Sequence, residues 1–277
     1  MGGRGHCEPM VTHTPSCPRL VVFSDLDGTL LDHMSYDWSP AQPALDCMLD
    51  LGIPLVLASS KTAFEIYELR AEMGFSHVPA IVENGAGLLR AGEIPNSDLN
   101  DYAALLAAVS DIPLPLRRSF QGFSGWSVDQ IARETGLSVT RAALAAQRQF
   151  SEPGKWVGAQ DRLDAFITAL SERGVFARRG GRFLTLSFGA TKADHMADIM
   201  AEWAPPPLSL ALGDAPNDTD MIAAADFGVI ITNPDAPPLA PMAGEAKGRI
   251  TRSTDSGPVG WNKSVLERIE QIYDIKR

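Results

Sequence analysis

The sequence predicts an α/β protein with a doubly wound, Rossmann-like parallel-sheet core and an inserted α+β cap domain. Near both ends of the chain, apolar runs typical of buried strands alternate with segments of helical spacing, which is the pattern of βαβ units. Between these parts, residues 87–190 have shorter elements and more loops. We therefore expect a core from residues 20–86 and 191–277, interrupted by a cap at residues 87–190.

The first part of the core is expected to alternate between strands and helices. The expected strands are residues 20–24, 53–58 and 79–82, and the expected helices are residues 40–51 and 62–73. Gly52 and Gly74 follow the two helices, where glycine is common because it adopts left-handed backbone angles readily. This order predicts parallel strands joined by helical crossovers.

The cap and the second part of the core follow in order. In the cap we expect helices around residues 101–109, 127–134, 140–149 and 161–172, and strands near residues 175–178 and 183–187. In the core we then expect helices at residues 191–203, 218–225 and 258–273, and strands at residues 208–212 and 227–231. The return of the alternation indicates one sheet domain interrupted by an insertion.

Composition and charge exclude several classes of partner. The chain has 277 residues, 45% of them hydrophobic and 21% charged, which is typical of a soluble globular protein with one or two domains. The formal net charge of −10 argues against a nucleic-acid partner. No apolar run is long enough for a membrane span, so we expect no membrane partner. These features give no oligomeric state.

Residues 1–19 are expected to form a loose N-terminal extension. They lack the apolar stretch of a signal peptide, which favours a cytoplasmic location. The extension contains His6, Cys7, His13 and Cys17, whose spacing matches no common zinc site. The whole chain has three cysteines, so we expect no disulfide framework.

Two acids separated by one residue, Asp25 and Asp27, follow the first predicted strand. Side chains two apart on an extended chain point the same way, so both carboxylates should face the edge where open α/β sheets bind ligands. Gly28 lets the chain turn sharply after them. Two like charges this close favour a hard cation such as Mg²⁺, and Asp25 offers a nucleophile. On its own, the same motif is also compatible with a plain turn.

A second acidic cluster follows the strand predicted at residues 208–212. Asp214 can supply another oxygen ligand, and Asp218 can bind a cation or orient its ligands. Asn217 can donate its amide to a phosphate, although Asn217 and Asp218 would also suit a helix start. Lys192 begins a predicted helix, where its ammonium can neutralise a phosphate and the nucleophile.

The segment after the second predicted strand suits an anion. Ser59 offers a hydroxyl, with Ser60 and Lys61 beside it, and the helix that follows offers free backbone N–H groups. Ser59 could instead serve only as a cap for that helix. Further along, Asn84 and Gly85 form a turn signal that could also contact a substrate.

At these motifs the chain resembles the haloacid dehalogenase-like phosphatases. That family has an Asp-x-Asp after the first strand, a Ser or Thr after the second, a Lys, and a late Gly-Asp with further acids. The matching residues occur in that order and are Asp25, Asp27, Ser59, Lys192, Asp214, Asn217 and Asp218. The insertion between Ser59 and Lys192 also resembles the Cof-type subclass, whose cap is inserted there.

The resemblance implies Mg²⁺-dependent phosphomonoester hydrolysis through a phosphoaspartate. Asp25 would attack phosphorus, while Asp27 would protonate the leaving alcohol and then activate water. Ser59 and Lys192 would hold the transferring phosphoryl group. The implied Mg²⁺ residues are Asp25, Asp27 (also through its carbonyl oxygen), Asp214 and Asp218.

Segments 59–62, 82–85, 148–153 and 257–262 further resemble the mannosyl-3-phosphoglycerate phosphatases. This resemblance implies a small phosphorylated glycoside as substrate and the compatible solute mannosylglycerate as product. Arg148 would meet the carboxylate, and Glu152 or Glu83 the sugar hydroxyls. The substrate-binding residues expected from these arguments are Ser60, Lys61, Asn84, Arg148, Glu152 and Asn217.

Several alternatives remain at this stage. The same motifs serve glucosyl-3-phosphoglycerate phosphatases, other sugar-phosphate phosphatases and phosphosugar mutases. A phosphoacceptor that does not hydrolyse its phosphoaspartate is a more remote alternative. The cap charges could form ordinary surface ion pairs, and we expect Arg178 and Arg179 to lie on a solvated face.

Overall fold

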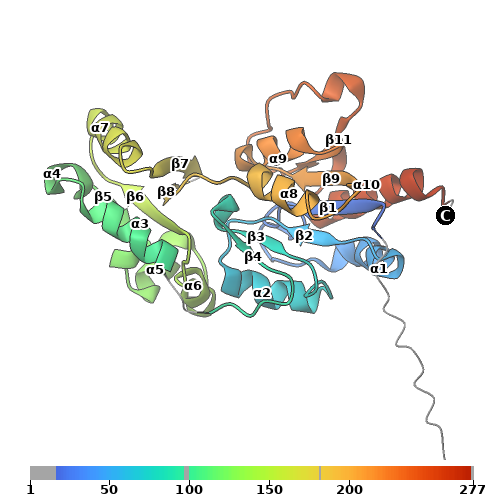
Figure 1. Ribbon diagram of the computed structural model, residues 1–277, viewed down its shortest axis with the longest axis horizontal. Coiled ribbons are helices and arrows are strands. Elements are labelled where there is room, and N and C mark those ends of the chain that lie inside the picture. Colours follow the sequence, from blue (N-terminus) through green and yellow to red (C-terminus); the bar gives the residue numbers. More distant parts are fainter. Residues whose placement is uncertain (1–16, 97–99, 181, 276–277) are drawn as a thin grey trace, which may run out of the picture.

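The computed structural model describes residues 17–96, 100–180 and 182–275 (Figure 1). The predicted N-terminal extension therefore lies outside the described residues, apart from its last three positions. None of the helices in the described ranges combines the length and the apolar character that crossing a membrane requires.

The core is a parallel sheet with the strand order β11-β10-β9-β1-β2 in the described chain. The strands are β1 (Leu20–Ser24), β2 (Leu55–Leu57), β9 (Leu208–Gly213), β10 (Phe227–Thr232) and β11 (Ile250–Ser256). Strand β1 is buried along its whole length, as expected for a central strand covered on both faces. The predicted α/β class with a doubly wound core is confirmed.

Helices cover this sheet in two groups. They are α1 (Gln42–Leu51), α2 (Ala63–Glu72), α8 (Lys192–Met200), α9 (Thr219–Ala224) and α10 (Gly257–Tyr273). Helix α1 packs against α10, and α8 packs against α9. The chain moves from β1 to β2 in one direction and from β9 to β10 in the other, so right-handed crossovers place α1 and α9 on opposite faces.

The sequence predicted one of the three remaining core strands, β3, but not β4 or β11. Strand β3 (Ala80–Val82) is joined to the main sheet by a bridge between Ala58 and Ile81, and pairs antiparallel with β4 (Gly87–Leu89). Strand β11 was not predicted, because its residues are mostly polar and exposed at the sheet edge. Leu89 still belongs to the hydrophobic cluster of the core, and the cap boundaries at residues 86/87 and 190/191 stay a prediction.

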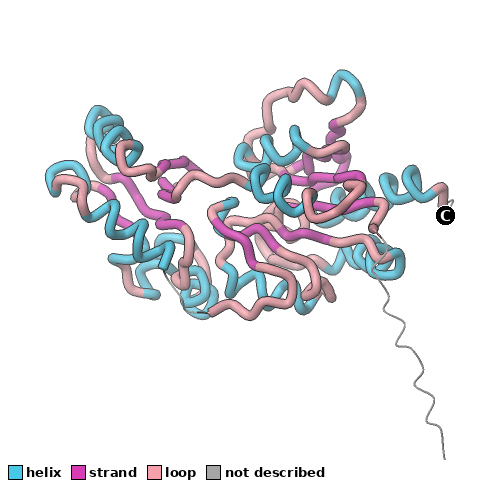
Figure 2. Tube along the Cα trace, viewed as in Figure 1, coloured by secondary structure: helices cyan, strands magenta, loops and turns pink. Residues whose placement is uncertain are grey.

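The inserted segment forms a second, antiparallel sheet with the order β5-β6-β8-β7 in the described chain (Figure 2). Its strands are β5 (Phe120–Gly122), β6 (Ser151–Trp156), β7 (Phe176–Gly180) and β8 (Phe183–Ser187). Its helices are α3 (Asn100–Ser110), α4 (Leu114–Arg117), α5 (Val128–Thr135), α6 (Val139–Ala145) and α7 (Gln160–Ser171). This is the α+β cap that the sequence predicts.

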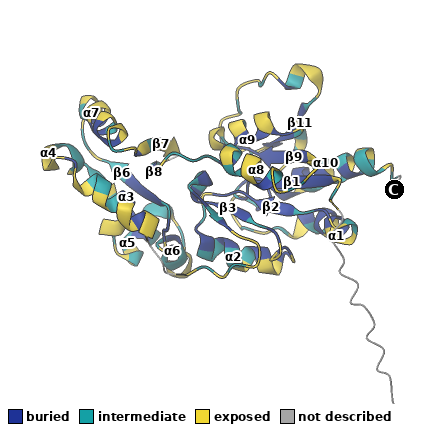
Figure 3. Cartoon of the chain, viewed as in Figure 1, coloured by how far each residue is buried: buried dark blue, intermediate teal, exposed yellow. Residues whose placement is uncertain are grey.

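The cap sheet has two different faces. Leu184 and Leu186 of β8 belong to a buried cluster that includes residues of α3 and α7 (Figure 3). Alternate residues of a strand point to opposite faces, so Thr185 and Ser187 face the other way, toward the core. Residues paired directly across antiparallel strands share a face of the sheet. The pairing of β6 and β7 with β8 therefore shows which of their residues face the helices and which face the core.

Candidate active site

The carboxyl ends of neighbouring strands β1 and β9 bring acidic side chains together. Asp25 directly follows β1, and Asp214 directly follows β9. With Asp218 they form a buried cluster, in which each residue offers an oxygen within 4.8 Å of the others. Parallel neighbours end at the same sheet edge, which is why acids 189 positions apart in the sequence meet.

Lys192 joins two of these acids. It is the first residue of α8, which Thr191 and Asp194 cap reciprocally. Its buried Nζ donates to an Oδ1 of both Asp25 and Asp218, each at 2.7 Å. Burial alone would lower the pKa of the Lys192 ammonium, but attraction to Asp218 and Asp25 outweighs it and raises the pKa. The lysine therefore remains a fixed positive charge.

The acidic cluster carries more negative charge than Lys192 offsets. Burial, followed by repulsion from Asp218, raises the pKa of the Asp25 carboxyl well above its usual range despite Lys192. Burial also raises the pKa of Asp214, although the carboxylate accepts hydrogen bonds from Asn233 and Thr29. A divalent cation would relieve both costs.

The shape of the site fits a hard cation. The Asp214 oxygens are oriented by Thr29 Oγ1 and Asn233 Nδ2, each at 2.7 Å. Gly28 has a φ of +86°, and a Cβ there would lie 2.6 Å from Asn233 Nδ2 and 2.9 Å from an Asp214 oxygen. Only glycine therefore leaves this cradle open. Carboxylate and carbonyl oxygens are the ligands that Mg²⁺ prefers.

Asp218 is better placed to orient the site than to bind a cation directly. One of its oxygens accepts from Lys192, and the other accepts from the backbone N–H groups of Asp214 and Ala215 at 3.2 and 3.0 Å. It thereby holds the loop after β9 in place, which is one of the two roles that its sequence position suggested.

Asp27 lies apart from this cluster. Its carboxylate accepts two hydrogen bonds from Lys61 Nζ, at 2.7 and 2.8 Å, and its side chain is 30% exposed. Asp27 and Lys61 both line a cavity of 780 Å³ between the core and the cap. The side chain is thus held at the edge of the cavity, where it can reach a bound molecule.

Comparisons with known proteins identify the fold of the chain. Residues 22–105 match the sequence model of a haloacid dehalogenase-like hydrolase family. A solved structure from Thermoplasma acidophilum is 15% identical and covers 94% of this chain and 100% of its own, with a TM-score of 0.61. The chain has the haloacid dehalogenase-like fold.

Two phosphatases share this haloacid dehalogenase-like fold over nearly their whole length. The sucrose-phosphatase from Synechocystis, solved with sucrose and phosphate, is 17% identical, with a TM-score of 0.60 and coverage of 92% of this chain and 98% of its own. A phosphatase of the haloalkanoate superfamily from Bacteroides thetaiotaomicron is 20% identical, with a TM-score of 0.59 and coverage of 98% and 100%. At these identities the likeness establishes the architecture.

Within this haloacid dehalogenase-like core, Ser59 is buried and its hydroxyl accepts from the Lys61 N–H at 3.3 Å. The helix that follows is capped by Thr62 together with Glu65, so the alternative that Ser59 serves only as that cap is wrong. Ser60 and Lys61 line the cavity, whereas Ser59 lies beneath it.

Asn84 and Asn217 meet at the cavity wall, and their role in binding substrate stays a prediction. Asn217 Nδ2 donates to Asn84 Oδ1 at 3.0 Å, and both residues line the cavity. The two amides come from different loops and line the same cavity as Lys192, where they offer groups able to donate and accept hydrogen bonds.

The structure does not bring Glu152 to the cavity. Glu152 pairs with Leu186 across β6 and β8, so it points to the helix-covered face. Its buried carboxylate accepts from Tyr102 Oη at 2.5 Å and from Ser124 Oγ at 2.6 Å. Arg148 does line the cavity, but its buried guanidinium donates to Ser151 and pairs with another carboxylate, described below.

Arg178 and Arg179 are exposed, as expected, and both also line the cavity. Arg178 pairs with Thr185 and therefore lies on the face toward the core. Its guanidinium donates to the carbonyls of Gly189 and Ala190 at 2.7 and 3.1 Å. No alternation of apolar and polar residues marks this orientation, because β7 is an edge strand with few apolar residues.

Other supporting residues were also missed. Asn233 follows β10 and Thr29 follows the Asp-x-Asp-Gly run, so both positions could have been found from the strand ends. Trp261 belongs to the last helix, α10. It is fully buried, and its Nε1 donates to Ser24 Oγ, which in turn donates to the Asp25 carbonyl at 2.6 Å.

Proposed function

We propose that this protein is a phosphomonoester hydrolase that works through a phosphoaspartate and converts mannosyl-3-phosphoglycerate to mannosylglycerate. The observation that carries the proposal is the buried cluster of Asp25, Asp214 and Asp218, two of which bind Lys192, a residue that lines the cavity between the core and the cap. In a haloacid dehalogenase-like fold, this cluster lies where phosphoryl transfer would need it.

In the first step, an Asp25 oxygen attacks phosphorus and the bond to the leaving alcohol breaks. Asp27 gives its proton to the departing oxygen, and Lys192 neutralises charge on Asp25 and the phosphoryl oxygens. Asp27 then takes a proton from water, which attacks phosphorus and releases Asp25 and inorganic phosphate. To act, Asp27 must part from Lys61, whose ammonium can pair with an anionic substrate oxygen instead.

Mg²⁺ fits the donors of the site. Asp25 and Asp214 would hold it, together with the Asp27 carbonyl oxygen, while Thr29, Asn233 and Asp218 orient the loops. When bound, the ion supplies positive charge that offsets repulsion between the acids and the substrate.

The cavity supports a glycoside with a second anionic group. Its volume of 780 Å³ suits a disaccharide-sized ligand, and the sucrose-phosphatase with the same fold binds sucrose and phosphate. Asn84 and Asn217 can pair with hydroxyls, and Arg178 can meet the glycerate carboxylate. Glucosyl-3-phosphoglycerate offers the same groups and is the second candidate substrate.

Phosphate release tests the proposal directly. The full chain is assayed with Mg²⁺, and separately with EDTA, on mannosyl- and glucosyl-3-phosphoglycerate, 3-phosphoglycerate and mannose 6-phosphate. We expect Mg²⁺-dependent release, fastest from mannosyl-3-phosphoglycerate. Faster release from the glucosyl ester would change the named substrate. Isomerised phosphosugar with little free phosphate would indicate a mutase, and no turnover of any ester would overturn the hydrolase proposal.

A further inference from the structure

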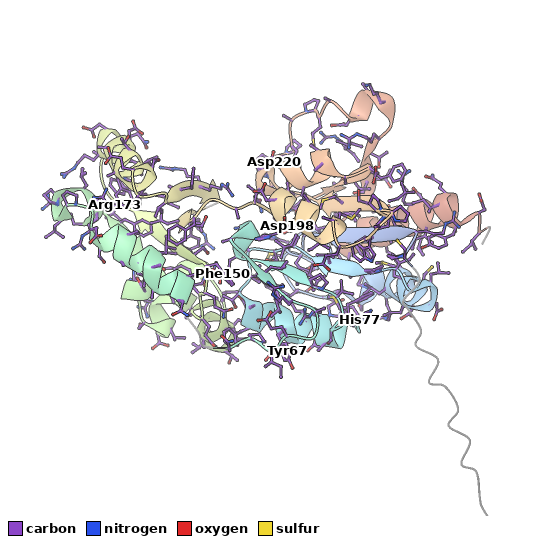
Figure 4. The ribbon with its side chains drawn as sticks, viewed as in Figure 1. Tyr67, His77, Phe150, Arg173, Asp198 and Asp220 are labelled. Atoms are coloured by element: carbon purple, nitrogen blue, oxygen red, sulfur yellow. The ribbon has the colours of Figure 1, made fainter. Side chains whose placement is uncertain are left out.

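A buried carboxylate of the core is satisfied entirely by the cap. Glu83 lies between β3 and β4, in a 3₁₀ turn over Glu83–Gly85, and its side chain is 0% exposed. All donors to this carboxylate among the described residues come from the cap segment 148–151, which leads into β6. The segment approaches the core at Phe150, near the junction of the two parts (Figure 4).

The donors surround Glu83 closely. They are the backbone N–H groups of Gln149 (2.8 Å), Phe150 (3.2 Å) and Ser151 (2.8 Å), the Ser151 hydroxyl (2.8 Å) and the Arg148 guanidinium (3.2 Å). A carboxylate only accepts: four of these five donors reach Oε2, and the Gln149 N–H reaches Oε1. An amide of the same shape would turn an NH₂ group toward other donors and leave a buried mismatch.

The turn that carries Glu83 is itself tightly constrained. Glu83, Asn84 and Gly85 have φ values of +52°, +61° and +85°, and the first two are strained because they carry side chains. A Cβ on Gly85 would lie 2.2 Å from the backbone nitrogen of Lys192. The surrounding structure therefore holds this turn against the start of α8, which carries the catalytic lysine.

The same turn also binds the other substrate loops. The Glu83 N–H donates to the Lys61 carbonyl at 2.9 Å, and the Asn84 N–H donates to the Ser59 carbonyl at 2.8 Å. Asn217 reaches the Asn84 side chain from the third loop. These core contacts use backbone groups or Asn84, so they do not depend on the Glu83 carboxylate.

We propose that Glu83 is a positioning residue that anchors cap strand β6 to the catalytic loops. The anchor sets where the cap residues of the cavity, such as Pro153 and Thr185, stand relative to Lys61 and Lys192. The effect of this anchor on catalysis rests on the proposed function, whereas the anchor itself does not. Arg148 offsets the buried charge of Glu83 rather than meeting a substrate carboxylate.

Hydrogen exchange tests the anchor without any assay of activity. In the wild type, the amides of Gln149 and Ser151 should exchange slowly because they donate to a buried carboxylate. In Glu83→Gln we expect these amides to exchange at least about tenfold faster, since the local opening costs less. Protection in β1 and β9 should be unchanged. Equal protection at 149 and 151 in both proteins would overturn the proposal.

Kinetics then test the functional consequence. A glycosyl phosphate contacts core and cap together, whereas p-nitrophenyl phosphate needs little of the cap. Misplacing the cap by about 1 Å should lower kcat/KM for the glycosyl ester by roughly 10²-fold and that for the aryl ester by less than about threefold. A general loss of folded protein would lower both in proportion. An unchanged ratio would contradict the positioning role.

The chain offers a matched pair of milder variants, useful if Glu83→Gln folds poorly. Ser151→Ala removes a hydroxyl donor from Glu83 at the junction, and Ser124→Ala removes one from Glu152 inside the cap. We expect only Ser151→Ala to speed exchange at residue 149 and to change the ratio between the two substrates. If the two variants had the same exchange rate at residue 149 and the same ratio between the substrates, the anchoring role of Glu83 would be contradicted. If no ester is hydrolysed, the exchange data still decide it.

Discussion

The two walls of the cavity differ in how their polar groups are paired. On the core wall, Lys192 lines the cavity and donates hydrogen bonds to the buried Asp25 and Asp218. On the cap wall, Arg178 is exposed and donates to linker carbonyls, beside the half-buried Thr185. The difference indicates that the core wall is organised before substrate arrives, whereas the cap wall has free capacity to recognise a substrate.

Asp25→Asn should have the largest effect, because it removes the only proposed nucleophile from the organised wall. We expect turnover to fall by roughly 10⁴-fold or more while the fold is retained, since an amide is a similar shape. Phosphate release and circular dichroism measure the two quantities. Undiminished phosphate release would break the assignment of chemistry to the core wall.

Lys192→Met tests whether pairing on the core wall also matters for folding. It leaves Asp25 and Asp218 buried without their cation, which should lower the free energy of unfolding by about 3–5 kcal/mol when Mg²⁺ is absent. Urea unfolding with EDTA measures this. The control is Lys61→Met, whose partner Asp27 is partly exposed, and we expect a clearly smaller loss.

Mg²⁺ should stabilise the core through the acidic cluster. At a concentration 100 times its Kd, a bound ion adds about 2.7 kcal/mol to the free energy of unfolding, which raises Tm. Asp214→Asn should abolish most of this shift, because it removes an oriented ligand. Thermal unfolding with Mg²⁺ and with EDTA gives both shifts. A shift of the same size in the variant would place the ion elsewhere.

Arg178→Gln tests recognition by the cap wall. We expect kcat/KM for esters with an anionic leaving group to fall by roughly tenfold, and that for mannose 6-phosphate to change little, because one charge-assisted contact is lost. Arg118→Gln, an exposed arginine elsewhere in the cap, is the matched control. Loss of activity on all esters alike would assign Arg178 to the linker rather than to the substrate.

The exposed ion pair between Glu245 and Arg252 should contribute less to the free energy of unfolding than the buried pairs of Lys192. Hydrogen bonds from Arg252, then from the Met242 N–H, lower the pKa of Glu245 from 4.5 to about 2. Because the folded-state pKa is depressed, this stabilisation is present above pH 4.5 and is lost as pH falls toward 2. Glu245→Gln should therefore flatten the acid side of a stability–pH profile slightly. A large change near pH 7 would contradict this.

Several residues of the candidate site in the core were predicted from their positions directly after apolar strand segments. Asp25 and Asp214 were found because each follows an apolar run, and parallel strands end at one edge of the sheet. Lys192 was found from its place at a helix start and from motif order. The partners that orient them, such as Asn233, depend on contacts between loops, which no local pattern reports.

The cap was harder to predict. Glu152 looked like a substrate residue, but its place on β6 turns it toward Tyr102. Which face of a half-buried strand is covered depends on where helices pack, and a shift of one residue exchanges the two faces. Arg178 is exposed as expected, but its place at the cavity could not be predicted, because a charged edge strand has no apolar alternation to show its orientation.

The sequence by itself determined which chemical groups the site contains and at which edge of the sheet they lie. The reason is that the acids directly follow apolar strand segments, which is a local pattern of the chain. Only the tertiary structure decided which carboxylate reaches the cavity and which one joins the cap to the core. Glu83 and Glu152 are both buried acids, yet one is bonded across the junction and the other within the cap. Their partners lie far away along the chain, so the folded packing alone selects them.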